Sequence, residues 1–153
     1  LSRTRIVSAD SIGNVSRLNL SDDLERMHFM DFENAPGFDY RDIDGDGNRE
    51  FIFLDAQRLM VFNQDKAPVL SYTFDSPTEP APQLFFFDTK DVRIGARCPE
   101  KGELHLINNG GADTEGFPIM GTTAFSIGKL NGDRGLPLVC GNNRKYLCAY
   151  PLR

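Results

Sequence analysis

The sequence predicts an all-β fold, and three observations lead to this prediction. Apolar residues alternate with polar residues over short runs, as expected for strands with one buried face. Gly, Pro, Asn and Asp interrupt these runs about every 8 to 12 residues, which is typical of turns between strands. The pattern of strands also recurs along the chain. Only Ser21–Met27 has helical character, as a short turn capped by Ser21.

Fourteen short strands are expected in chain order. Leu84–Phe87 is continuously apolar, which predicts an inner strand buried on both faces. The expected strands are Arg5–Ala9, Val15–Leu20, His28–Phe32, Phe38–Asp42, Glu50–Leu54, Leu59–Asn63, Val69–Phe74, Gln83–Phe87, Val92–Ala96, Glu103–Asn108, Phe117–Met120, Ala124–Gly128, Leu136–Cys140 and Tyr146–Tyr150.

The strands repeat in groups of four. Apolar segments anchor the second strand of each group at Arg5–Val7, Phe51–Phe53, Val92–Ile94 and Leu136–Leu138. A repeat of about 40 to 45 residues with four antiparallel strands is the signature of a β-propeller blade. The expected units are 1–35, 36–80, 81–121 and 122–153, about four blades in all. They predict either a minimal ring or, more in keeping with the ragged ends, the C-terminal part of a larger propeller.

Composition excludes several classes of protein. The 153 residues correspond to one domain, and the net charge of −5 with scattered Lys and Arg argues against nucleic-acid binding. The apolar runs are far shorter than the ~20 residues of a membrane helix. Leu1–Asp10 lacks a signal-peptide pattern, so we expect a mature product or a piece of a longer protein.

An acidic loop at Asp42–Glu50 predicts a metal site. Calcium takes six to eight oxygen ligands, and a tight loop supplies them from side chains at alternate positions. Gly47 lies where the turn requires a positive φ, and Asn48 offers its backbone carbonyl. The predicted calcium ligands are Asp42, Asp44, Asp46, Asn48 and Glu50.

The same residues are open to two other interpretations, an EF-hand and a metal-free turn. An EF-hand requires a Glu at loop position 12, where Phe53 stands, and it requires flanking helices where strands are expected here. A metal-free acidic turn, held by hydrogen bonds from backbone N–H groups to Asp and Asn side chains, remains a second reading of the same residues.

The segment Tyr40–Phe53 resembles the FG-GAP and VCBS type of propeller repeat, found in integrin head domains and many secreted bacterial proteins. The resemblance implies a calcium-binding loop between the first and second strands of a blade. A weaker copy lies at Phe125–Gly141, where Lys129 replaces the first acidic ligand and Pro137 replaces the closing acid. In the third unit the loop is shortened to Phe87–Asp91.

No catalytic residue is predicted. His28 and His105 lie in expected strands without a neighbouring nucleophile motif, and no phosphate-binding loop or His-Glu-x-x-His motif is present. Cys98, Cys140 and Cys148 match no zinc pattern. A Cys140–Cys148 disulfide is conceivable, but a turn at Asn142-Asn143 would place Cys140 opposite about Lys145, so three small buried hydrophobic residues are the favoured reading.

The favoured function is a non-catalytic binding or assembly scaffold with one structural calcium loop and a protein or glycan partner. The alternative is the C-terminal propeller portion of a secreted glycan- or peptide-processing enzyme, with catalytic residues outside this chain. Exposed blade edges also predict a homodimer. A low-affinity calcium loop favours an extracellular or periplasmic location, where calcium is millimolar.

Overall fold

A computed structural model describes residues 6–18, 23–129 and 135–152, and it confirms the all-β prediction. Within these ranges every regular element is a strand. The strands are β1 (Ile6–Ala9), β2 (Asn14–Leu18), β3 (Leu24–His28), β4 (Gly37–Arg41), β5 (Glu50–Leu54), β6 (Arg58–Phe62), β7 (Pro68–Thr73), β8 (Gln83–Phe86), β9 (Val92–Cys98), β10 (Glu103–Ile107), β11 (Ile119–Met120), β12 (Ser126–Ile127), β13 (Leu136–Gly141) and β14 (Leu147–Leu152).

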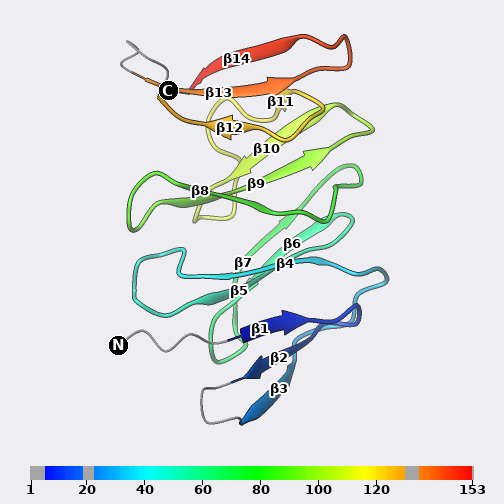
Figure 1. Ribbon diagram of the computed structural model, residues 1–153, viewed down its shortest axis with the longest axis vertical. Helices are drawn as coiled ribbons and strands as arrows, with labels where there is room; N and C mark the ends of the chain where they lie inside the picture. Colours follow the sequence, from blue (N-terminus) through cyan, green and yellow to red (C-terminus); the bar gives the residue numbers. More distant parts are fainter. Residues whose placement is uncertain (1–5, 19–22, 130–134, 153) are drawn as a thin grey trace.

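The strands form four antiparallel sheets, each made from consecutive strands. Their orders are β1-β2-β3, β4-β5-β6-β7, β11-β10-β9-β8 and β12-β13-β14. Figure 1 shows the sheets following one another along the long axis, with the first and last sheets at opposite ends. Sheets of three or four antiparallel strands, each packed on the next, make a small all-β, propeller-like architecture.

Strand β5 shows why the second sheet forms where it does. All five of its residues are buried, and successive side chains point to opposite faces of the sheet. Phe51 and Phe53 pack toward the first sheet, whereas Ile52 and Leu54 pack toward the third. The strand therefore contributes to two apolar layers at once.

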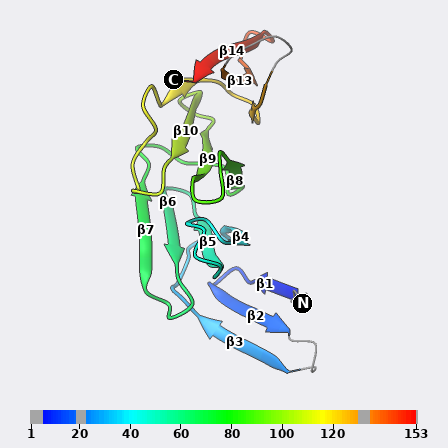
Figure 2. The ribbon, with the colours of Figure 1, turned by 90° about the vertical axis from the view of Figure 1, so that its left-hand side faces the viewer.

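Three apolar layers join the four sheets. Between the first and second sheets the layer is rich in phenylalanine, and the Phe29 ring lies 4.6 Å from Phe51 and 5.3 Å from Phe62 between centroids. Aliphatic residues dominate the layer between the second and third sheets. Between the third and fourth, Leu104 and Leu138 are fully buried, and Phe85 stacks on Phe125. Figure 2 shows the same succession of sheets from the side.

Two elements expected near the N-terminus differ from the structure. The strand expected at His28–Phe32 is not present, because strand β3 occupies Leu24–His28. β3 also takes up Leu24–Met27 of the helical turn expected at Ser21–Met27, whereas Ser21 and Asp22 lie outside the described ranges. Val15 pairs with Met27, and Met27 is the one buried residue of β3. A strand that buries so little has no clear alternation from which it could be recognised.

The prediction that the aromatic run Leu84–Phe87 is buried on both faces was also wrong. The run does form the first strand of a four-stranded sheet, β8, but it is not buried on both faces. Phe86 is 62 % exposed, whereas Phe85 packs in the layer between the third and fourth sheets.

The C-terminal hairpin has a longer turn than expected. Asn142 Oδ1 accepts hydrogen bonds from the N–H groups of Arg144 and Tyr146, and Lys145 adopts a φ of 63°. This turn places Cys140 opposite Cys148 rather than opposite Lys145. Both cysteines, like Cys98, are free thiols. No helix in the described residues is long and apolar enough to cross a membrane.

Candidate metal site

The acidic loop joins the end of β4 to the start of β5, so strands flank it on both sides. Arg41 and Glu50 are paired across the two strands, which brings the ends of the loop together. Carboxylate oxygens of Asp42, Asp44 and Glu50 all lie within 4.8 Å of one another. Three of the five predicted ligands therefore converge on one point.

Asp42 organises the loop. Its Oδ1 accepts a hydrogen bond from the Gly45 N–H at 2.7 Å, and its Oδ2 accepts one from the Gly47 N–H at 3.0 Å. Gly45 and Gly47 have φ values of 75° and 92°, a region that L side chains rarely adopt. The turn thus needs glycine at both positions. A positive φ was predicted from the sequence at Gly47 and not at Gly45.

Glu50 is the buried member of the cluster, with only 3 % of its surface exposed. Its Oε2 accepts the backbone N–H of Ile43 at 2.9 Å. Burial raises the pKa of Glu50, and the hydrogen bond from Ile43 offsets only part of that rise. The neighbouring charges of Asp44, Asp46 and Asp42 raise the pKa further. A desolvated carboxylate beside like charges is the electrostatic setting that a hard cation relieves.

The other two predicted ligands, Asp46 and Asn48, are bonded to each other. Asp46 accepts the N–H of Asn48 at 2.6 Å and the Asn48 Nδ2 at 3.1 Å. These hydrogen bonds lower the pKa of Asp46. Asp46 and Asn48 therefore hold each other in the exposed part of the loop.

The neighbouring sheet supports the loop from outside. A Cβ placed on Gly45 would lie 2.4 Å from the Thr89 carbonyl oxygen, so the loop and the β8–β9 turn are in close contact. Asn109 Nδ2 donates to the Lys90 carbonyl at 2.6 Å and to the Ile43 carbonyl at 3.3 Å. Asn109 lies 66 residues from Ile43, and no sequence signal linked the two.

Of the two weaker copies of the acidic loop, the structure describes one in full and the other only in part. Lys129 and Pro137 are described, but residues 130–134 between them lie outside the described ranges. The shortened loop in the third unit closes as a tight turn, in which Asp88 Oδ1 accepts the N–H groups of Lys90 and Asp91. Among the described residues, Asp42, Asp44 and Glu50 form the one cluster with metal-ligand spacing.

Comparison of the sequence with protein-family models and with curated proteins gave no match. Among solved structures, the chain is similar to the selenomethionine-substituted virginiamycin B lyase from Staphylococcus aureus, with a TM-score of 0.48 and 14% sequence identity. The similarity covers 95% of this chain and 54% of the lyase chain. The chain thus spans about half the length of that structure.

The two histidines belong to the sheets on either side of the second sheet, and neither is part of the acidic cluster of Asp42, Asp44 and Glu50. His28, at the end of β3, is exposed, and its Nδ1 lies 2.9 Å from Asn14 Oδ1. These two residues line a recess of about 500 Å³ together with Asp10, Ser16, Arg26 and Met27.

His105, in β10, is buried at the junction of the second and third sheets. Its Nδ1 lies 3.1 Å from Asp113 Oδ2, and the Tyr72 hydroxyl donates to the same oxygen at 2.6 Å. Burial acts to raise the pKa of Asp113, but the hydrogen bonds from His105 and Tyr72 outweigh it and lower that pKa. Burial, with the nearby Asp113, raises the pKa of Tyr72. No motif in the sequence predicted that Tyr72, His105 and Asp113 would meet between the two sheets.

Proposed function

We propose that this chain is a non-catalytic binding or assembly scaffold in which the acidic loop holds a structural calcium ion. The observation that supports the proposal best is the convergence of Asp42, Asp44 and Glu50, with Glu50 buried among like charges. Oxygen-only ligands and a flexible acidic loop suit calcium better than zinc, which takes nitrogen and sulfur ligands.

In this proposal Tyr40–Phe53 is a calcium-binding repeat of the FG-GAP and VCBS type. Calcium would offset the repulsion among the carboxylates and fix the turn between β4 and β5. Because the loop also contacts the β8–β9 turn, the ion would stiffen the junction of the second and third sheets. Such a loop is useful where calcium is millimolar, so an extracellular or periplasmic location is part of the same proposal.

Thermal unfolding of chelator-treated protein tests the calcium site. Added calcium should raise the melting temperature, because a ligand at one hundred times its Kd stabilises the folded state by about 2.7 kcal/mol. For a domain of this size that corresponds to roughly 5 to 10 °C. The Asp44→Asn variant should lose most of the shift, and Glu100→Gln, in the exposed β9–β10 turn, should keep it. An unchanged melting temperature at millimolar calcium would refute the proposal.

The partner of the scaffold is proposed to be a protein or a glycan, and a second copy of the chain is one such protein. The outer edge of β14 pairs with no other strand of the described residues. Leu147, the first residue of β14, is 80 % exposed, and the preceding Tyr146 is 66 % exposed. An unpaired, flat strand edge is a template for antiparallel pairing with another chain. We propose that two copies pair through β14.

A further inference from the structure

A recess of about 520 Å³ lies on the third sheet, beside the acidic loop of the second. It is lined by the β8–β9 turn, by β9 and by the β10–β11 connection, through Lys90, Asp91, Arg93, Asn108, Asn109, Gly110, Thr114 and Glu115. Its volume is within the range of about 300 to 1,000 Å³ that is usual for small-molecule sites. Neither the sequence motifs nor the acidic loop accounts for it.

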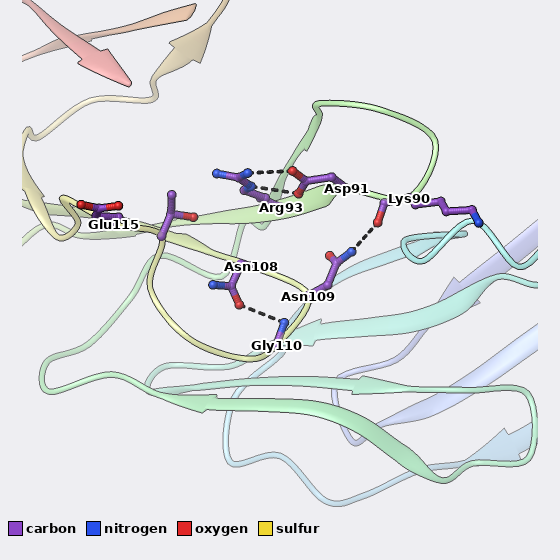
Figure 3. Close-up of a pocket in the computed structure, with 8 residues that line it drawn as sticks. Lys90, Asp91, Arg93, Asn108, Asn109, Gly110 and Glu115 are labelled. Atoms are coloured by element: carbon purple, nitrogen blue, oxygen red, sulfur yellow. Dashed lines mark hydrogen bonds and ion pairs between the residues drawn. The ribbon is translucent and has the colours of Figure 1, made fainter. Parts of the chain in front are cut away.

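Hydrogen bonds fix two walls of the recess before any ligand arrives. Arg93 donates from Nε and Nη2 to the two carboxylate oxygens of Asp91, and its guanidinium lies 4.1 Å from the centre of the Phe87 ring. On the other side Asn108 Oδ1 accepts the Gly110 N–H at 2.9 Å. Figure 3 shows the Arg93–Asp91 pair facing the Asn108–Gly110 turn, with Glu115 at one end and Asn109 at the other.

Thr114 gives an independent sign that a polar ligand belongs here. The residue is 8 % exposed and lines the recess, and its hydroxyl is buried without a hydrogen-bond partner. A buried hydroxyl left unpaired costs about 1 to 3 kcal/mol. The backbone of Thr114 is held by its N–H, which donates to the Leu106 carbonyl at 2.7 Å. Only the hydroxyl is left to form a new bond.

The charges around the recess select against an ionic ligand. Lys90 and Arg93 oppose Asp91 and Glu115, so the lining has no net charge. Arg93 is already neutralised by Asp91, and the Lys90 side chain extends away from the other labelled residues in Figure 3. A phosphate would be repelled by Glu115 and would find no free positive charge, because Arg93 is paired with Asp91. An ammonium group drawn to Glu115 would lie beside the Arg93 guanidinium. A neutral ligand with groups that both donate and accept hydrogen bonds avoids these conflicts.

We propose that this recess binds a neutral, hydroxyl-rich ligand, a saccharide or the sugar end of a glycan. The free hydrogen-bonding groups fit sugar hydroxyls, because Glu115 accepts, Arg93 Nη1 donates, and the Thr114 hydroxyl does either. This inference rests on the proposed binding function and names a site and a ligand class for it. It is independent of the calcium ion itself.

Ligand-observed NMR on the calcium-saturated full chain tests the proposal. The probes are glucose, galactose, mannose, N-acetylglucosamine and their β-linked disaccharides, with inorganic phosphate and methylammonium as charged probes. We expect at least one saccharide to bind at millimolar concentration or below and the charged probes not to bind. If no saccharide of the panel binds, or if phosphate or methylammonium binds in the recess, the proposal is wrong.

Three variants locate the binding. Glu115→Ala should weaken it about tenfold, which is the loss of one hydrogen bond to a charged group. Thr114→Val should weaken it as well without loss of thermal stability, since the hydroxyl has no partner to lose. Glu100→Ala, in the β9–β10 turn, should bind like the parent. If Glu115→Ala and Thr114→Val bind the saccharide as tightly as the parent and Glu100→Ala do, the ligand binds elsewhere and the proposal is wrong. A failed sugar titration with an intact calcium shift would refute this inference alone.

Discussion

Among single residues, Glu50 has the least favourable electrostatic surroundings in the acidic loop. Its pKa is raised above the ordinary value of 4.5, so the folded chain binds a proton at this site more tightly than the unfolded chain does. In metal-free protein this site therefore lowers stability as pH rises from the ordinary glutamate value through the higher folded-state value. Bound calcium should remove that pH dependence.

Glu50→Gln tests this assignment. The amide oxygen can still accept the Ile43 N–H, but the buried charge is gone. At neutral pH the metal-free variant should melt at a higher temperature than the metal-free parent, and it should gain no stability from calcium. Melting curves with chelator and with calcium measure both effects. A metal-free variant that melts below the parent would contradict the electrostatic reading of Glu50.

Tyr72→Phe tests the polar contact between the second and third sheets. The change removes the donor to Asp113 and keeps the ring that packs against Phe74 at 4.8 Å. We expect a loss of about 1 to 2 kcal/mol in the free energy of unfolding, measured with urea. Tyr146→Phe, at an exposed position, should change it by less than about 0.5 kcal/mol. Equal effects of the two variants would mean that the Tyr72–Asp113 bond adds no stability.

The contact between Tyr72 and Asp113 should weaken at low pH, because it depends on the charged form of Asp113. Its pKa is below the ordinary value of 3.8, so its contribution to stability is present above that value and is lost as pH falls through the folded-state pKa. Asp113→Asn should therefore flatten the acid limb of a plot of unfolding free energy against pH. An acid limb identical to that of the parent would show that Asp113 is not responsible.

At the scale of elements, the turn of the acidic loop depends on two glycines with different surroundings. Ala at either position is forced into a left-handed conformation, at a cost of about 1 to 2 kcal/mol. At Gly47 nothing lies within 4 Å of the added Cβ, whereas at Gly45 the Thr89 carbonyl lies at 2.4 Å. Gly45→Ala should thus be more destabilising than Gly47→Ala in urea unfolding. Equal losses would show that the loop does not press on the β8–β9 turn.

Strand positions were predictable where burial imposes a clear pattern. β5 was expected at its observed bounds, and β6, β9 and β10 lie within one or two residues of theirs at each end, since each has several fully buried residues. β3 was missed because it buries only Met27. β11 and β12 lie inside the strands expected at Phe117–Met120 and Ala124–Gly128, but each has only two residues.

Part of the candidate site was also predictable, in this case from the spacing of its residues along the chain. The spacing of Asp42, Asp44 and Glu50 along the chain is short, so local geometry alone brings them together. Contacts between sheets left no such signal. The Asn109 bonds to the Ile43 and Lys90 carbonyls, and the Tyr72 bond to Asp113 across 41 residues, arise only when the sheets pack.

For the whole molecule, the exposed edge of β14 makes a prediction about assembly. Light scattering coupled to size-exclusion chromatography should detect a dimer, and Leu147→Lys should shift it to monomer, because a lysine on an edge strand opposes pairing. Leu24→Lys makes the same change on an exposed position of β3 and should leave the dimer intact. A parent protein that is monomeric at high concentration would refute pairing through β14.

The proposed calcium ion would fix the acidic loop, which links β4 to β5 and contacts the third sheet. Long-wavelength anomalous diffraction from crystals grown with calcium tests this proposal most directly. We predict an anomalous peak between the carboxylates of Asp42, Asp44 and Glu50, and its absence in crystals of Glu50→Gln. A calcium-soaked crystal of the parent with no peak at these carboxylates would show that the acidic loop does not bind calcium.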